Sequence, residues 1–444
     1  MRLTLLEILE ATGGGEIGGT QVGERFATYH TDSREVKPGG IFFALRGAEM
    51  DGHRFVADAI SHGASAVVVE HRTEIPSGIV EVVVPDTWKA LYDLAASVLA
   101  RVKPVVVAIT GSNGKTSTKE MAAAVLSQRF NVLRTIGNLN TETGVPMTIL
   151  SLERDHTALV VEMGLQRTGD IARLVALARP KIGVITNIGA VHMEFFETQD
   201  DLARAKGELV AGLPSDGRAV LNSDDRFLDL LSSLSSAPVT TFGTGVGDYR
   251  VSDYRALPEG GCTFKVNSVD VEVAVGGRHQ ALNAAAALAA GEEAGVTLVQ
   301  GAPALSSVAV EHRLQTFDAP AGFTVIDDAY NASPESMLAA FAAVSERPHE
   351  GKLLAVLGHM GELGRSADDA HVQIGEVAGK TFDEVAVVDS PLGRILAHAA
   401  HAEVVPDNAA AAAWVRARAR AGDRVLIKGS HSRRLEEVVA ELTR

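Results

Sequence analysis

The sequence predicts an α/β protein in which mostly parallel sheets are covered by helices and the chain is divided into three domains. Three observations predict this class. The 444 residues exceed what one compact core usually holds. Short apolar runs alternate with helical patterns from Val105 onward and again after Arg313, which is typical of parallel, helix-covered sheets. A glycine-rich turn over residues 110–116 also joins a strand directly to a helix.

The N-terminal block, about residues 1–100, contains short valine-rich strands at Val67–Val69 and Val82–Val84, with helical stretches between them. It ends at a connector, Arg101–Pro104, because a proline disfavours helix at the residue before it. The first ten residues, Met1–Glu10, are amphipathic and carry acids within the apolar stretch. They are therefore not predicted to be a signal peptide.

The middle block alternates strands and helices, changes to a turn-rich β region between about Val239 and Val275, and closes with an Ala-rich helix, Gln280–Gly291. The last block returns to strand–helix alternation, and its Ala-rich stretch Asn408–Arg420 is predicted to be helical. The strands expected in the two α/β blocks are Val105–Ile109, Leu159–Glu162, Ile182–Thr186, Ala219–Leu221, Phe323–Ile326, Leu353–Leu357, Val385–Val388 and Val425–Ile427.

Composition and charge exclude several classes of function. Lys and Arg total 41 while Asp and Glu total 56, which gives a net charge of −15. Nucleic acids and anionic membranes bind to basic faces, so neither partner is expected. Cys262 is the only cysteine, so no intrachain disulfide can form, as in the reducing cytoplasm. No segment has about 18 uninterrupted apolar residues, so no membrane span is predicted and a cytoplasmic location is expected.

The segment Thr110–Thr116, Thr-Gly-Ser-Asn-Gly-Lys-Thr, predicts a nucleotide phosphate site. It follows the apolar strand Val105–Ile109 and opens a helical pattern. Backbone N–H groups at the helix start would face phosphate oxygens, Lys115 adds a positive charge, and the Thr116 hydroxyl can ligate Mg²⁺. The longer phosphate-loop spacing would need a glycine where Ile109 stands, so this is the shorter form. A chance Gly-Lys-Thr turn is the alternative.

Polar residues follow two other predicted strands. Glu162 ends the strand Leu159–Glu162, and strand C-termini in an open α/β sheet face the ligand crevice, so this carboxylate is placed to bind Mg²⁺ beside Thr116. A capping or solvated acid is the alternative. His192 follows the strand Ile182–Thr186 and is a candidate for a metal or phosphate role, with a structural histidine as the alternative.

On their own, residues Asn138–Pro146 predict only a turn, and Lys206 predicts only a surface lysine on a helix. A resemblance over the whole chain gives both a role. Together the sequence resembles the Mur ligases, the ATP-dependent amide-bond-forming enzymes of peptidoglycan synthesis. The segments that carry this resemblance are Thr110–Thr116, Gly137–Pro146, Glu162–Gly164, Thr186–His192 and Ala205–Glu208. Thr31–Arg34 and Asp51–His53 also fit a uridine-nucleotide-binding N-terminal domain.

The resemblance implies a role for each matching residue. ATP would be bound by Gly111, Ser112, Asn113, Gly114, Lys115, Thr116, Ser117, Asn138, Asn283, Arg313, Asp327, Asp328, Tyr330 and Asn331. The UDP-linked substrate would be bound by Ser33, Arg34, Asp51, Gly52, His53, Asn140 and Thr141. Two Mg²⁺ ions would be held by Thr116, Glu162, His192 and a carbamylated Lys206. Catalytic roles are implied for Lys115, Glu162, His192, Lys206 and Arg313.

Two of these implied roles carry structural conditions. Carbamylation would give Lys206 an oxygen ligand for a hard cation, and it requires a neutral amine. Lys206 should therefore be partly buried or near positive charge. Arg313 and the pair Asp327 and Asp328 would reach ATP only when the domains close. The resemblance also sets the domains: residues 1–102 would bind the UDP-linked substrate, 103–312 would form the central P-loop ATP-binding domain, and 313–444 would form a Rossmann-like domain.

Three segments point to one reaction within the family. Gly137–Asn140, Asp327–Pro334 and Leu357–Gly364 are similar to the members that add a dipeptide, so the implied substrates are UDP-N-acetylmuramoyl-tripeptide and D-Ala-D-Ala. Lys428–Ser430 would line the amino-substrate side, and a monomer is expected. The residues that depart from the common pattern, at positions expected to touch the peptide or the dipeptide, are Gln166, Arg167, Ser333, His359 and His431.

Other interpretations remain. The preceding Mur ligase adds diaminopimelate or lysine, but this chain lacks an Asp-Asn-Pro-Arg segment. Folate-polyglutamate ligases share the central domain but leave Thr31–Arg34 and Asp51–His53 unexplained. An inactive nucleotide-binding scaffold would predict that the metal-binding residues are missing, yet Glu162, His192 and Lys206 are present.

Overall fold

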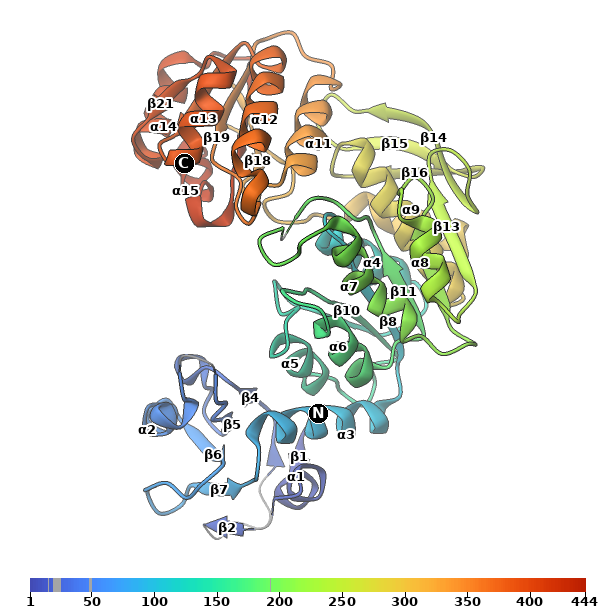
Figure 1. Ribbon diagram of the computed structural model, residues 1–444, viewed down its shortest axis with the longest axis vertical. Coiled ribbons are helices and arrows are strands. Elements are labelled where there is room, and N and C mark those ends of the chain that lie inside the picture. The colour runs from blue at the N-terminus through green and yellow to red at the C-terminus, as the bar shows by residue number, and fades with distance from the viewer. Residues whose placement is uncertain (15, 19–24, 48–49, 192) are drawn as a thin grey trace. The chain divides into compact units, whose positions relative to one another are not determined.

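The computed structural model describes residues 1–14, 16–18, 25–47, 50–191 and 193–444 (Figure 1). His192, expected to bind metal, lies outside the described residues. The chain forms two compact units. The first comprises Met1–Ala108, Phe130–Gly164 and Ala172–Lys181, and the second comprises Ile109–Arg129, Leu165–Ile171 and Ile182–Arg444. Both units combine helices with mostly parallel strands, which confirms the predicted fold class.

The first unit holds a sheet in the order β2-β7-β6-β5-β4, in which β4 to β7 are parallel and β2 is antiparallel to β7. Phe42, Val67 and Val69 of this sheet pack against Val56 and Ala59 of α2. The elements of this unit are β1 (Leu3–Thr4), α1 (Leu5–Thr12), β2 (Glu16–Gly18), β3 (Arg25–Phe26), β4 (Tyr29–His30), η1 (Ser33–Glu35), β5 (Gly40–Phe43), η2 (Gly52–Phe55), α2 (Val56–Ser61), β6 (Ala64–Val69), β7 (Val80–Val83), α3 (Thr87–Val102), β9 (Val132–Arg134), α5 (Gly144–Leu150), β10 (Ala158–Glu162) and most of α6 (Asp170–Ala178).

Two loops predicted in the first unit, a connector and a turn, can be compared with the structure. Helix α3 ends at Val102, so Arg101 and Val102 are helical, and the predicted connector Arg101–Pro104 is confirmed only for Lys103 and Pro104, where Lys103 takes a left-handed conformation. The turn predicted to run through Pro146 is wrong at its end, because α5 begins at Gly144. Pro146 lies in the first turn of that helix, where the missing N–H is not needed for an intrahelical hydrogen bond.

The second unit begins within β8 (Val105–Thr110), which starts in the first unit. Its remaining elements are α4 (Lys115–Leu126), β11 (Ile182–Ile185), α7 (Gln199–Ala211), β12 (Arg218–Asn222), α8 (Leu228–Leu234), β13 (Val239–Gly243), β14 (Tyr249–Ala256), β15 (Cys262–Val266), β16 (Val269–Val273), α9 (Arg278–Glu293), α10 (Leu298–Gly301), η3 (Ala302–Ser307), β17 (Gln315–Asp318), β18 (Thr324–Asp328), α11 (Pro334–Ser345), β19 (Leu353–Leu357), η4 (Gly364–Ser366), α12 (Ala367–Thr381), β20 (Glu384–Val388), α13 (Pro391–Ala400), β21 (Glu403–Val405), α14 (Asn408–Arg418), β22 (Arg424–Lys428), η5 (His431–Arg433) and α15 (Glu436–Leu442).

The strands β11 to β14 of this unit are parallel to one another in chain order, and β14 to β16 form an antiparallel extension. The predicted change to turn-rich β structure after Val239 is therefore confirmed. The Ala-rich helix α9 is buried along almost its whole length and packs against α4. Its small side chains let neighbouring elements approach closely, and this brings the start of α9 next to the glycine-rich turn.

The last sheet runs in the order β17-β18-β22-β19-β20-β21 and is parallel except for β17. Helices cover both of its faces, with α11 to α13 on one face and α14 and α15 on the other (Figure 1). Alternate residues of one strand, such as Leu354 and Ala355, therefore enter different cores. Helix α14 ends at Arg418 rather than Arg420, because Ala419 is extended.

Candidate nucleotide site

The predicted strand–turn–helix is present: β8 ends at Thr110 and α4 begins at Lys115. Two glycines make the turn possible. Gly111 has a φ of 148°, and a Cβ there would lie 1.9 Å from the Thr186 hydroxyl oxygen. Gly114 has a φ of 81°, and a Cβ there would lie 2.4 Å from Oδ1 of Asn283. Both positions therefore require glycine, since conformation and space each exclude a side chain.

Side chains and backbone at the end of β11 hold this turn in place. The Ser112 N–H donates to the Asn187 carbonyl at 2.8 Å, and the Asn113 N–H donates to Asn187 Oδ1 at 3.0 Å. The Asn113 carbonyl accepts from the Thr186 hydroxyl at 2.6 Å and from Asn187 Nδ2 at 3.1 Å. The Asn187 side chain thus accepts one hydrogen bond and donates another, so it fixes both the N–H and the carbonyl of Asn113.

Two lysines meet at one carbonyl of the turn. Lys115 Nζ donates to the carbonyls of Gly111 at 2.9 Å and Ser112 at 3.1 Å, and Lys206 Nζ donates to the Gly111 carbonyl at 2.9 Å. Lys206 lies on α7 and is only 1% exposed, so the surface position suggested by the helix pattern is wrong. Burial, with the charge of Lys115 added, lowers the pKa of Lys206 well below its usual value. The condition of burial near positive charge is therefore met.

A cavity of about 300 Å³ opens beside the turn. Asn283, Arg313 and Asp328, three of the residues expected to bind ATP, line it. The other residues that line it are Asn113, Gly114, Ser117, Thr186, Asn187, Ile188, Gly189, Asn222, His279, Gln280, Leu282, Glu335, Ser336, Ala339 and Lys428. This volume, next to a loop of backbone N–H groups and two lysines, suits a compact anionic ligand.

Sequence reasoning missed several of the residues that line the cavity. His279 and Gln280 lie one helical turn before Asn283 on α9, so the helical spacing could have indicated them. Burial, with the charges of Lys428 and Arg313 added, lowers the pKa of His279 to about 4, although Asp328 opposes this effect. His279 is therefore neutral at pH 7 and can accept a hydrogen bond from a ligand.

Lys428 was expected to line the amino-substrate side, and it lines this cavity. It ends β22, pairs with Asp328 at 2.6 Å and donates to the Asn331 carbonyl at 2.9 Å. Burial lowers its pKa, and the adjacent carboxylate opposes that effect. The Asp328–Lys428 pair ties β18 to β22 at the carboxyl edge of the sheet, where open α/β sheets bind ligands.

The segment Asp327–Asn331, expected to bind ATP, is only partly at the cavity, which Asp328 lines. Asp327, Tyr330 and Asn331 are not among the residues that line it. The Asp327 carboxylate instead binds His312 Nδ1 at 2.6 Å and the Ala329 N–H at 3.0 Å. The Arg313 guanidinium lies 4.3 Å from the centre of the Tyr330 ring, a cation–π contact.

Two contacts join α11 to the turn and to the loop after β11. The Ser333 hydroxyl donates to Asn113 Oδ1 at 3.0 Å, and the Ala190 N–H donates to Glu335 Oε1 at 2.7 Å. Ser333 is one of the residues that depart from the common pattern, and its hydroxyl also caps α11. Its position beside Asn113 places it at the phosphate turn.

The other departures lie elsewhere. His359 Nδ1 is 3.0 Å from the Ser390 hydroxyl, and the His431 ring lies 5.8 Å from the Tyr330 ring. The backbone N–H groups of Gln166 and Arg167 both donate to Asp170 Oδ2 at 2.9 Å.

The first unit holds the expected carboxylate ligand. Glu162 ends β10 and is 2% exposed, and Asn140 Nδ2 donates to its Oε1 at 2.8 Å. Asn140 was expected to bind the UDP-linked substrate, but its amide is directed to Glu162. Asn138 and Thr141 are exposed on the same loop. The joint role of Glu162 and Thr116 as metal ligands stays a prediction.

The residues expected to bind the uridine nucleotide lie at the carboxyl ends of β4 and β5. Asp32 caps η1, which holds Ser33 and Arg34, and its carboxylate binds the exposed Arg34 guanidinium at 2.5 Å. The Gly52 N–H donates to the Leu45 carbonyl at 2.8 Å, and a Cβ at Gly52 would lie 2.5 Å from that oxygen. Glycine is therefore required for this close approach.

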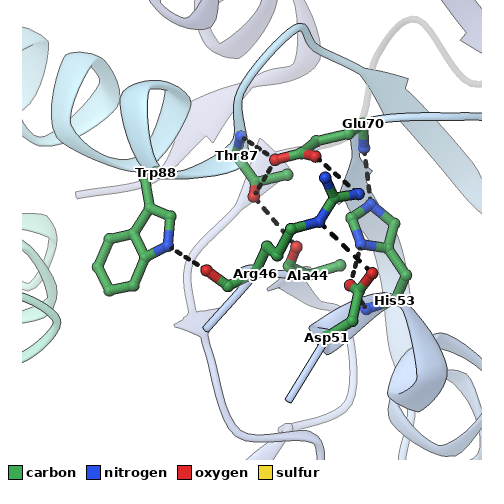
Figure 2. A network of polar contacts seen from close by, with 7 residues as sticks. All are labelled: Ala44, Arg46, Asp51, His53, Glu70, Thr87 and Trp88. Carbon is green, nitrogen blue, oxygen red and sulfur yellow. Dashed lines mark hydrogen bonds and ion pairs between the residues drawn. The ribbon is translucent and has the colours of Figure 1, made fainter. Parts of the chain in front are cut away.

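Figure 2 shows a polar network around His53. Its Nε2 accepts from the Glu70 N–H at 2.8 Å, so the proton lies on Nδ1, which donates to Asp51 Oδ1 at 2.6 Å. Arg46 bridges the two acids, 3.2 Å from Glu70 Oε2 and 3.5 Å from Asp51 Oδ2. Thr87 also donates to Glu70, and the Trp88 indole donates to the Arg46 carbonyl at 2.9 Å. Both ring nitrogens of His53 are therefore used within the protein.

Comparison with known proteins identifies the family. The Mur ligase middle domain matches residues 109–291, the Mur ligase glutamate ligase domain matches 312–431, and the Mur ligase family catalytic domain matches 26–124. UDP-N-acetylmuramoyl-tripeptide–D-alanyl-D-alanine ligase of Escherichia coli is 36% identical over 441 residues, with 96% of each chain covered. The chain belongs to the Mur ligase family.

Further relatives agree with this Mur ligase assignment. The Bacillus subtilis enzyme of the same name is 34% identical, with 93% of this chain and 92% of the relative covered. A crystal structure of MurF from Acinetobacter baumannii has a TM-score of 0.89 at 30% identity and covers 100% of this chain and 99% of its own. MurF ligase from Thermotoga maritima, solved in complex with ADP, has a TM-score of 0.83 at 30% identity, with 94% and 97% covered. The three-domain architecture of the Mur ligases is therefore the architecture of this chain.

Two findings bear on metal and membrane in this Mur ligase. Among residues 1–14, 16–18, 25–47, 50–191 and 193–444, no group of three or more His, Cys, Asp or Glu side chains could hold a metal ion. The expected metal ligands are Thr116, Glu162, carbamylated Lys206 and His192, and His192 lies outside these ranges. Of the other three, only Glu162 belongs to these four residue types, so this finding does not test the expected site. Within the same described ranges, no helix has both the length and the apolar character that crossing a membrane requires.

Proposed function

We propose that this protein is the ATP-dependent ligase that joins D-Ala-D-Ala to UDP-N-acetylmuramoyl-tripeptide and produces ADP and phosphate. The observation that carries the proposal is the phosphate turn with its two converging lysines beside a cavity lined by Asn283, Arg313 and Asp328. The relatives that match nearly the whole chain bear the name of this activity. The position of the site at strand ends of two sheets supports nucleotide binding.

The reaction proceeds through an acyl phosphate. A carboxylate oxygen of the tripeptide attacks the γ-phosphorus of ATP, and the bond from that phosphorus to the β–γ bridging oxygen breaks to release ADP. The amine nitrogen of D-Ala-D-Ala then bonds to the acyl carbon, loses its proton, and phosphate leaves. Such transfers need positioning and charge neutralisation rather than a nucleophile from the protein.

Residues of this chain supply that positioning. The backbone N–H groups at the start of α4 and the Lys115 side chain hold the β- and γ-phosphates of ATP, while the N–H groups of Ser112 and Asn113 are bound by Asn187. Arg313, which lines the same cavity, adds charge-assisted hydrogen bonds to the transferred group. Asn283 and Asp328 line the same cavity and are assigned to ATP binding.

Mg²⁺ fits the residues present. Glu162 is a buried carboxylate, Thr116 offers a hydroxyl at the start of α4, and the lowered pKa of Lys206 favours the neutral amine that carbamylation needs. In that modification the Lys206 nitrogen bonds to the carbon of CO₂ and a proton is released. We assign two Mg²⁺ ions to Thr116, Glu162, His192 and carbamylated Lys206. Bound Mg²⁺ would neutralise charge on the phosphate oxygens.

The UDP-linked substrate is assigned to the first unit. Ser33, Arg34 and Asp51 lie at strand ends of its parallel sheet, and the half-exposed or exposed side chains of Arg34 and Asp51 can reach a ligand. His53 supports this site through Asp51 rather than by direct contact, since both its nitrogens are used.

The test is phosphate release in the presence of Mg²⁺, ATP and a UDP-N-acetylmuramoyl-tripeptide, with and without D-Ala-D-Ala. Release that requires D-Ala-D-Ala, with the pentapeptide nucleotide identified by mass, is the expected result. Release with a dipeptide nucleotide and a diamino acid would assign the preceding step instead. Tight ATP binding without release for either acceptor would favour an inactive scaffold.

A further inference from the structure

The segment that carries Arg313 has an unusual backbone. His312 has a φ of 54° and Leu314 has a φ of 53°, so both neighbours of Arg313 lie in the left-handed region. Residues with large side chains rarely adopt this region, because Cβ approaches the backbone too closely. Two such residues around a single cavity-lining arginine need contacts that hold them there.

Two adjacent carboxylates at the end of β18 provide these contacts. Asp327 Oδ2 lies 2.6 Å from His312 Nδ1, and Asp328 Oδ1 accepts from the Leu314 N–H at 3.2 Å. The His312 N–H also donates to Gln315 Oε1 at 3.0 Å, and Gln315 pairs with Asp327 in the β17–β18 ladder. The residue before Arg313 and the residue after it are thus each tied to one of the two acids.

Burial makes the His312–Asp327 contact important. Asp327 is 1% exposed, and burial raises its pKa while the bonds from His312 and Ala329 oppose this effect. A buried carboxylate that loses a hydrogen-bond donor becomes less stable in its charged form. Removal of the His312 ring would therefore disturb both Asp327 and the left-handed turn.

Arg313 itself is directed to the cavity and to one aromatic ring. Its guanidinium stacks on Tyr330, and within the described part of the chain no hydrogen-bond acceptor contacts it. Its N–H donors are thus available to an anion in the cavity. The place of the guanidinium therefore depends on the backbone on either side and on the Tyr330 ring.

We propose that His312, held by Asp327, is a positioning residue that sets the backbone of Arg313 so that its guanidinium faces the phosphates of the nucleotide. This rests on the proposed function. Asp327 then acts through His312 and does not bind ATP directly, in contrast to the role implied for it by the family resemblance. Asp328 also helps to hold the backbone of this segment, because it accepts the Leu314 N–H in addition to pairing with Lys428.

Three variants at position 312 separate the contribution of the hydrogen bond to Asp327 from that of the left-handed backbone conformation. His312→Asn keeps a donor for Asp327 and tolerates the left-handed region, His312→Gly keeps only the conformation, and His312→Ala keeps neither. We expect kcat/KM for ATP to fall by at least about tenfold in His312→Ala, to recover in part in His312→Gly, and to recover most in His312→Asn. The KM for the UDP-linked substrate should stay unchanged throughout. His398→Ala, which removes an exposed histidine of the same sheet domain, is the matched control.

Asp327→Asn, made in the wild-type and His312→Ala backgrounds, completes a double-mutant cycle. The effect of Asp327→Asn on kcat/KM for ATP should be small in the His312→Ala background. Wild-type values of kcat and KM for ATP in His312→Ala, or equal losses in all three variants at position 312, would overturn the proposal. If the wild-type protein shows no D-Ala-D-Ala-dependent turnover, the proposed function fails. ATP affinity measured by calorimetry on the same variants would then still test the positioning role, with the same order expected.

Discussion

Lys115 and Lys206 donate to the same oxygen, the carbonyl of Gly111, each at 2.9 Å. Lys115 belongs to the start of α4 and Lys206 to α7, so side chains from two helices converge on the phosphate turn. Burial and the nearby like charge both disfavour a charged Lys206. The neutral amine is the form that reacts with CO₂, so the lowered pKa of Lys206 supports the carbamylation proposed for this residue.

Lys206→Ala should therefore abolish nearly all turnover, and added acetate or formate should restore part of it, because a small carboxylate can occupy the place of the carbamate. Lys206→Arg keeps a charge but cannot be carbamylated, so it should be inactive and insensitive to acetate. Phosphate release measures both. Lys380→Ala, at an exposed position on α12, serves as control. Full activity of Lys206→Ala without acetate would contradict the role.

Gly111→Ala tests the geometry of the turn. The new Cβ would lie 1.9 Å from the Thr186 hydroxyl oxygen, and that hydroxyl holds the Asn113 carbonyl. We expect the free energy of unfolding to fall by about 2–5 kcal/mol and ATP binding to be lost. Thermal unfolding and calorimetry measure these effects. Gly245→Ala is the control, since its Cβ would meet nothing closer than 3.8 Å. An unchanged ATP affinity in Gly111→Ala would show that the turn can shift without consequence.

The strands could be predicted because they are continuous buried runs, as at Leu353–Leu357, and burial on both faces leaves a clear apolar signal. Lys206 could not be placed in the same way. It lies between Arg204 and Glu208 on a helix whose polar pattern indicates solvent, and only the packing of α7 against the turn buries it. Contacts between distant segments, such as Asn140 with Glu162, leave no periodic signal in the sequence.

Asn140 is expected to orient the Glu162 carboxylate rather than to bind the UDP-linked substrate, because its amide donates to Glu162 Oε1 at 2.8 Å. Asn140→Ala should raise the Mg²⁺ concentration needed for the half-maximal rate by about 10–100-fold, as outer-shell substitutions at metal sites do. The KM for the UDP-linked substrate should remain as in the wild type. Titration of the rate with Mg²⁺ and with that substrate measures both quantities. A raised KM with an unchanged Mg²⁺ requirement would restore the original assignment.

His279 should make the stability of the protein depend on pH. Its pKa is about 4 in the folded chain, whereas an unfolded chain has the ordinary value of about 6.5. Between these values the unfolded state binds the proton that the folded state excludes. The contribution of the neutral His279 ring to the free energy of unfolding is therefore complete above pH 6.5. As the pH falls to 4, the free energy of unfolding decreases by at most about 3 kcal/mol because of this group.

His279→Gln removes that titration, so its unfolding temperature should fall less than that of the wild type when the pH is lowered from 7.5 to 4.5. The comparison uses thermal unfolding at several pH values without nucleotide, so that ligand binding does not contribute. His398→Ala, which removes an exposed histidine, should follow the wild-type curve. Parallel curves for His279→Gln and the wild type would mean that the folded protein accommodates the protonated ring. The neutral acceptor assigned to the nucleotide cavity would then be wrong.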